Sequence, residues 1–165
     1  MAAIRAAQLG AKVALIEKDK IGGTCLNRGC IPTKALYYSA KALDAARRSA
    51  DFGVNIKGVE FDLVKAVSRK NDIVKKLVGG VEQLLKGNGV EVLRGDGFIE
   101  YVGRVRVTKA DGTAEALGAK NIIVATGSEP ARIPAFNIDG KNVLTSTEML
   151  DLQEVPKSIL IIGGG

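Results

Sequence analysis

The sequence has 165 residues, of which 46% are hydrophobic and 4% aromatic, and its formal net charge is +6. This length suffices for one hydrophobic core, or for one core and part of another. No apolar run approaches the roughly 18 residues that a membrane-spanning helix needs. The basic residues are scattered among acids, and few aromatic side chains are present to stack on bases. The composition therefore indicates a protein without a membrane span or a nucleic-acid partner.

The first 17 residues combine a helical pattern with a strand pattern. We expect residues 1–10 to form a helix whose alanine-rich surface packs on a sheet, with Gly10 as its C-cap. Residues 12–17 predict a short buried strand that ends in Glu17. A helix, a strand and a terminal acid are typical of the second half of a dinucleotide-binding βαβ unit. Taken without the neighbouring segment, Glu17 is better explained as an ordinary solvated strand end.

Both cysteines, Cys25 and Cys30, lie in one glycine-flanked segment. Five helical steps cover roughly 7.5 Å, more than the usual Cα separation of about 4.4–6.8 Å in a disulfide. If the two cysteines join, the segment between them must leave helical geometry, and Gly29 makes such a turn easy because glycine tolerates positive φ. Pro32 suits the first turn of a following helix, whose positive dipole end favours a thiolate.

Two structural roles compete with redox chemistry for this pair. A stabilising crosslink is disfavoured because closing so short a loop contributes only about 2 kcal/mol. A zinc site is disfavoured because zinc usually takes four N or S ligands, and the chain has two cysteines and no histidine. Arg5, Gln8 and Lys12 interrupt the apolar run that a leader peptide would need at the N-terminus. A redox dithiol in a chain with no recognisable leader peptide indicates a reducing cytoplasm.

Two longer helices follow, and then the hydrophobic period changes to two. Helices are expected over 32–48 and, with Asp62 as N-cap, over 62–86. Strands are expected at 90–93, 97–100, 104–107 and 115–117, with a hairpin turn at Asp111-Gly112. Residues 120–125 predict a buried strand, Ser146–Leu150 a short helix and residues 158–162 a second buried strand that runs into glycines.

The segment Gly22-Gly23-Thr24-Cys25-Leu26-Asn27-Arg28-Gly29-Cys30-Ile31-Pro32-Thr33-Lys34 resembles the active-site segment of the pyridine nucleotide-disulfide oxidoreductases. Leu26 and Ile31 make it more similar to the lipoamide dehydrogenases of this family than to the glutathione and mercuric reductases. The sequence Ala-Thr-Gly-Ser at 125–128 resembles a second cofactor signature of the family. The resemblance predicts an α/β fold, an FAD-binding doubly wound (Rossmann-like) domain with a small β-meander, missing its first strand and phosphate loop.

The resemblance also implies the roles of individual residues. It implies a redox disulfide in which Cys25 exchanges with the substrate and Cys30 contacts flavin. Glu17 would bind the adenosine ribose, Gly97 would contact adenine through its backbone and Lys34 would approach the flavin ring. The full set of implied FAD-binding residues is Glu17, Lys18, Gly23, Thr24, Cys25, Lys34, Gly97, Ala125, Thr126, Gly127 and Ser128. No metal ligand is implied.

The resemblance covers the whole chain but only a middle part of the family's architecture. We expect an FAD-binding domain at 1–156 and, at 157–165, the first strand of an NAD-binding domain whose remainder lies outside the chain. The parent is expected to be a homodimer that oxidises the dihydrolipoamide of a lipoyl domain, in a 2-oxo acid dehydrogenase or glycine cleavage complex, and passes electrons through FAD to NAD⁺. The alternatives are a reductase of the glutathione or mercuric type, or a folded fragment without enzymatic activity.

Overall fold

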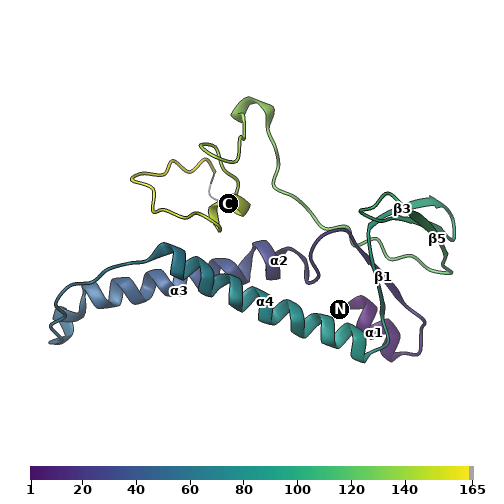
Figure 1. Ribbon diagram of the computed structural model, residues 1–165, viewed down its shortest axis with the longest axis horizontal. Coiled ribbons are helices and arrows are strands. Elements are labelled where there is room, and N and C mark those ends of the chain that lie inside the picture. Colours follow the sequence, from purple (N-terminus) through teal and green to yellow (C-terminus); the bar gives the residue numbers. More distant parts are fainter. Residues whose placement is uncertain (164–165) are drawn as a thin grey trace. The chain divides into compact units, whose positions relative to one another are not determined.

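A computed structural model describes residues 1–163. The chain divides into two compact units, one formed by residues 1–27 and 76–128 and the other by residues 28–75 and 129–163. The helix α4 (Leu63–Gly87) contributes to both units and runs without interruption through Gly79-Gly80 (Figure 1). This mixture of helices with parallel and antiparallel strands confirms the predicted α/β class.

The first unit is built on two parallel strands. The helix α1 (Ala2–Gln8) precedes β1 (Ala14–Glu17), which pairs in parallel with β2 (Glu91–Arg94). The core lies beside them and consists of Ile21, Leu85 and Val90, each at most 6% exposed. One face of α1 packs against this cluster through Ala3, Ile4 and Ala7, as its small side chains predict. Gly10 follows the helix with φ +89°, which suits a glycine at the helix end.

An antiparallel meander completes the first unit. It comprises β3 (Asp96–Tyr101), β4 (Arg104–Thr108) and β5 (Ala114–Gly118) in that spatial order. Val107, fully buried, and Val105, 7% exposed, alternate with arginines along β4, which explains the period of two in the sequence. The predicted turn at Asp111-Gly112 joins β4 and β5, with the Thr113 N–H and hydroxyl both donating to the Asp111 carboxylate.

The second unit is mainly helical. It contains the last residue of α2 (Gly23–Arg28), all of α3 (Cys30–Arg47), the 3₁₀ helix η1 (Ser49–Phe52) and the first half of α4. Asp62 accepts the Lys65 N–H at 2.9 Å, as its predicted N-cap role requires. Further along the chain lie the 3₁₀ helix η2 (Pro134–Phe136) and α5 (Ser146–Met149), which begins with a capping box between Thr145 and Glu148.

Two predicted strands are not formed. Residues 120–125 have no regular secondary structure, and Ile123 and Val124 are 68% and 67% exposed. Residues 158–162 are also irregular, and Leu160 is 88% exposed. Apolar runs become buried strands only when other strands bond to their backbones, and within residues 1–163 neither run has such a partner. Gly164 and Gly165, into which the second strand was predicted to run, lie outside the described residues.

Candidate functional site

The helix α2, which carries Cys25, begins at a glycine turn. Gly22 and Gly23 have φ values of +110° and +75°, which residues with a side chain rarely adopt. A Cβ on Gly22 would lie 2.2 Å from Cδ2 of Leu26, one turn into the helix. Both positions favour glycine by backbone conformation, and at Gly22 a side chain would also require Leu26 to move, whereas Gly23 has no atom within 4 Å of its Cβ position. The turn presents Cys25 and Thr24 as exposed residues in the first half of a six-residue helix.

The helix break predicted between the two cysteines is confirmed. Helix α2 ends at Arg28, Gly29 is non-helical and α3 begins at Cys30. Gly29 makes the turn without a positive φ: its φ is −131° and its ψ is −115°. The chain leaves α2 by this change in ψ, while the positive φ values belong to Gly22 and Gly23. Cys30 is exposed as the first residue of α3, at the positive end of the helix dipole.

Burial and one guanidinium hold the first turns of α3 in place. Pro32 and Ala35 are buried, and the missing N–H of Pro32 is tolerated because it falls in the first turn. Arg69 of α4 donates through Nη1 to the Ala35 carbonyl at 3.0 Å and to the Ser39 hydroxyl at 3.5 Å. The exposed Lys34 lies in the second turn of the same helix. The sequence did not identify Arg69, because its role depends on a contact with α3 at Ala35, which lies 34 residues away in the chain.

The carboxyl ends of β1 and β2 open onto a pocket of about 820 Å³. Ligands in parallel α/β sheets bind at this end of the strands. The pocket is lined by Lys18, Asp19, Arg94, Gly95, Asp96, Thr108, Lys109, Ala110 and Asp111. The pocket therefore includes Lys18, one of the residues predicted to bind the cofactor. It also includes Asp19, which follows Lys18 in the chain, and Asp96, which precedes Gly97.

Glu17 and Gly97 border this pocket without lining it. The Glu17 carboxylate accepts the Asp19 N–H at 2.9 Å, which fixes the turn that leaves β1. Gly97 packs on β1, and a Cβ there would lie 3.2 Å from Cγ2 of Ile16. A Cβ at 97 would require the Ile16 side chain to shift by a few tenths of an ångström. The structure thus brings Glu17, Lys18 and Gly97 to one region of the first unit.

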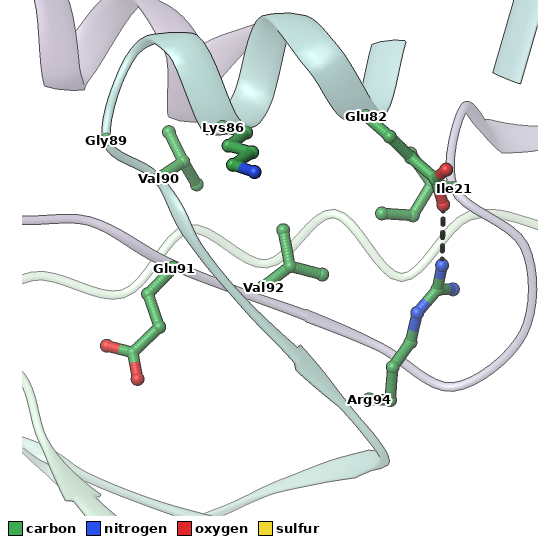
Figure 2. Close-up of a pocket in the computed structure, with 8 residues that line it drawn as sticks. All are labelled: Ile21, Glu82, Lys86, Gly89, Val90, Glu91, Val92 and Arg94. Carbon is green, nitrogen blue, oxygen red and sulfur yellow. Dashed lines mark hydrogen bonds and ion pairs between the residues drawn. The ribbon is translucent and has the colours of Figure 1, made fainter. Parts of the chain in front are cut away.

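Arg94 joins three elements around the same strand ends. Its Nη1 donates to the Asp19 carbonyl at 2.8 Å, and its Nη2 lies 2.9 Å from the Glu82 carboxylate of α4. Arg94 also lines a second pocket of about 570 Å³, with Ile21, Glu82, Lys86, Gly89, Val90, Glu91 and Val92. Figure 2 shows the Arg94–Glu82 pair there, with Glu91 pointing away from it. This second pocket contains none of the predicted site residues.

The predicted residues Ala125, Thr126, Gly127 and Ser128 lie apart from these pockets. All four are exposed and without regular structure, so the predicted strand does not present them. Gly127 has φ +78°, and a Cβ there would meet no atom within 4 Å. Its need for glycine is therefore conformational. Within residues 1–163 no cluster of three or more His, Cys, Asp or Glu side chains is placed to hold a metal, and no helix is long and apolar enough to cross a membrane.

The fold and the two helix-terminal cysteines define a class of protein. The family model of the pyridine nucleotide-disulphide oxidoreductases matches residues 1–165, and the chain belongs to that family.

Similar proteins within this family include dihydrolipoyl dehydrogenases. The chain is 51% identical over 164 residues to the dihydrolipoyl dehydrogenase of Chlorobaculum tepidum, covering 99% of this chain and 35% of the relative. It is 47% identical over 165 residues to that of Geobacillus stearothermophilus, again covering 35% of the relative. Among solved structures it resembles LpdA from Mycobacterium tuberculosis, with a TM-score of 0.82 and 26% identity over 93% of this chain and 34% of that one. The chain therefore spans about a third of the length of these relatives.

Proposed function

We propose that the full-length protein is a dihydrolipoyl dehydrogenase, in which residues 1–156 belong to an FAD-binding domain and residues 157–165 begin an NAD-binding domain. The observation that carries the proposal is the placement of Cys25 and Cys30. Both are exposed, and they lie on the consecutive helices α2 and α3, which Gly29 separates. The chain that carries them is 51% identical to a dihydrolipoyl dehydrogenase. A dithiol substrate can reach sulfurs placed in this way.

The residues present suit the adenosine part of FAD. The pocket at the carboxyl ends of β1 and β2 offers polar groups and two lysines, and Glu17 ends β1 where a ribose hydroxyl is bound in dinucleotide folds. We assign the adenosine to Glu17, Lys18 and Gly97. Gly23, Thr24, Lys34 and residues 125–128 are assigned to the remainder of the cofactor. Bound FAD would supply a two-electron acceptor that the dithiol reduces and NAD⁺ reoxidises.

The cysteines perform the thiol chemistry. A thiolate of dihydrolipoamide attacks Sγ of Cys25, which breaks the Cys25–Cys30 bond, forms a mixed disulfide and leaves Cys30 as the thiolate. The second substrate thiol then attacks the substrate sulfur of that mixed disulfide, which forms the cyclic disulfide and releases Cys25. Two electrons thus pass from the substrate to the cysteine pair. The start of α3 stabilises negative charge on Cys30.

The substrate is a dihydrolipoamide group on a lipoyl domain of a 2-oxo acid dehydrogenase or glycine cleavage complex, and the enzyme acts as a cytoplasmic homodimer. The similarity to two dihydrolipoyl dehydrogenases favours this substrate over glutathione disulfide or mercuric ion. Because residues 1–165 span only about a third of those relatives, we propose that they have no turnover alone.

Steady-state kinetics with purified full-length protein test this proposal. The expected result is oxidation of dihydrolipoamide with NAD⁺, with kcat/KM at least about 100-fold above that for glutathione disulfide or mercuric ion with NADPH. The isolated 1–165 chain, supplied with FAD, serves as the control and should give only the uncatalysed rate. Preference of the full-length protein for either other substrate would reject the assignment, and turnover by the isolated chain would reject its inactivity.

A further inference from the structure

Asn27 lies between the two cysteines and binds back to the start of its own helix. Its Nδ2 donates to the carbonyl of Ile21 and to the carbonyl of Gly23, each at 3.0 Å. A carboxamide nitrogen carries two hydrogens, so both of its donors are used. The first of these bonds spans six residues and crosses the Gly22-Gly23 turn. The side chain therefore ties the end of α2 to the residue before the turn.

This tie connects α2 to the core of the first unit. Helix α2 has six residues and none of them is buried, so packing contributes little to its position. Ile21, by contrast, is 3% exposed and belongs to the core cluster with Leu85 and Val90. Between Ile21 and α2 stands Gly22, and the helix itself begins at Gly23; glycine has the most conformational freedom of any residue type. The two hydrogen bonds of Asn27 restrict this junction.

The carboxamide oxygen of Asn27, unlike its nitrogen, has no hydrogen-bond partner in the described residues. Oδ1 of Asn27 is buried, and no donor within residues 1–163 reaches it. A buried acceptor without a donor is unfavourable. The position nevertheless holds an amide, which indicates that its two donors to backbone carbonyls outweigh the unsatisfied oxygen. An aspartate of the same shape would place a carboxylate against both carbonyls.

We propose that Asn27 is a positioning residue for the redox pair: by closing the Gly22-Gly23 turn, it restricts the motion of α2, and therefore of Cys25, before the disulfide with Cys30 forms. This inference rests on the proposed function, in which that disulfide is the redox group. A disulfide is favoured to the extent that the fold holds its sulfurs in place before the bond exists. Loss of the two Asn27 hydrogen bonds shifts the equilibrium toward the dithiol.

The test is a redox titration of the full-length protein in dithiothreitol buffers, with reduced cysteines trapped by alkylation and counted by mass. Asn27→Leu removes both donors without adding charge, and Asn27→Asp replaces them with a carboxylate. Asn88→Leu and Asn88→Asp are the matched controls, because Asn88 also donates its Nδ2 to a backbone carbonyl, that of Leu84 at 2.7 Å, at the end of α4. Urea unfolding of each variant reports its folding separately.

Both Asn27 variants should shift the disulfide equilibrium toward the dithiol by about tenfold, or about 30 mV, while both Asn88 variants leave it within twofold. An unshifted Asn27→Leu would overturn the inference, and a shift in Asn27→Asp alone would assign the effect to charge. Failure of both Asn27 variants to fold would replace positioning with a purely structural role. If the wild type forms no reversible Cys25–Cys30 disulfide, the proposed function itself fails, whatever the variants do.

Discussion

The two cysteines lie on helices that are held in different ways. Cys25 is on α2, a six-residue helix with no buried residue, which Asn27 ties to Ile21 by a hydrogen bond. Cys30 begins α3, an eighteen-residue helix with Pro32 and Ala35 buried. A short exposed helix depends on a few directional bonds, whereas a long one is also stabilised by packing. The position of Cys25 should therefore be easier to disturb than that of Cys30, which suits a thiol that must exchange with a substrate.

The largest effect on stability is expected where α2 meets the core. Ile21→Ala removes buried methyl groups from the cluster with Leu85 and Val90, and should lower the free energy of unfolding by about 2–5 kcal/mol. Urea unfolding of the full-length protein measures it. Val102→Ala is the control, because Val102 is 99% exposed and should change stability by less than about 0.5 kcal/mol. Equal losses in the two variants would show that Ile21 is not a core residue.

A smaller effect is expected at α3. Arg69→Met removes the hydrogen bond to the Ala35 carbonyl and should lower the free energy of unfolding by about 1–2 kcal/mol. Because Pro32 and Ala35 remain packed, the disulfide equilibrium should change less than in Asn27→Leu. Arg48→Met is the matched control: Arg48 pairs only with the exposed Asp44 and Asp51 in the described residues, and such surface pairs contribute about 0–1 kcal/mol. A larger redox shift for Arg69→Met than for Asn27→Leu would reverse the comparison.

The smallest effect concerns a loop whose geometry depends on one carboxylate. Asp139 accepts the backbone N–H groups of Val143, Lys141 and Asn142, which lower its pKa from 3.8 to about 2. The charged carboxylate stabilises the loop, so this contribution is fully present above pH 3.8 and is lost as the pH falls through about 2. NMR titration of the Asp139 carboxyl should give that midpoint, and Asp139→Asn should abolish it. A midpoint at or above 3.8 would contradict the loop geometry.

Local chemistry predicted much of this structure from the sequence. The helix starts at Asp62 and near Pro32, the turn at Asp111-Gly112 and the break between the cysteines all depend on residues close in the chain, and all are confirmed. The sequence left the φ angle of Gly29 open, because glycine permits several solutions to the same turn, and the structure has −131°.

Features that depend on distant residues were not predicted, or were predicted wrongly. Residues 120–125 and 158–162 have the composition of buried strands but lie without strand partners in the described part of the chain. Arg69 and Arg94 carry no local signal, because their hydrogen bonds reach backbone carbonyls 34 and 75 residues away in the chain. Asn27 bonds to carbonyls four and six residues away, but no sequence motif identified that role. The proposed roles of Glu17, Lys18 and Gly97 came from resemblance, and the structure adds the pocket beside them.

The most direct test of the division of labour between the cysteines is absorbance spectroscopy of FAD-loaded full-length variants. A thiolate next to oxidised flavin gives a charge-transfer band. Cys25→Ser leaves Cys30 as a thiolate at the start of α3 and should retain the band, whereas Cys30→Ser should remove it. Retention of the band in Cys30→Ser and its loss in Cys25→Ser would contradict the account.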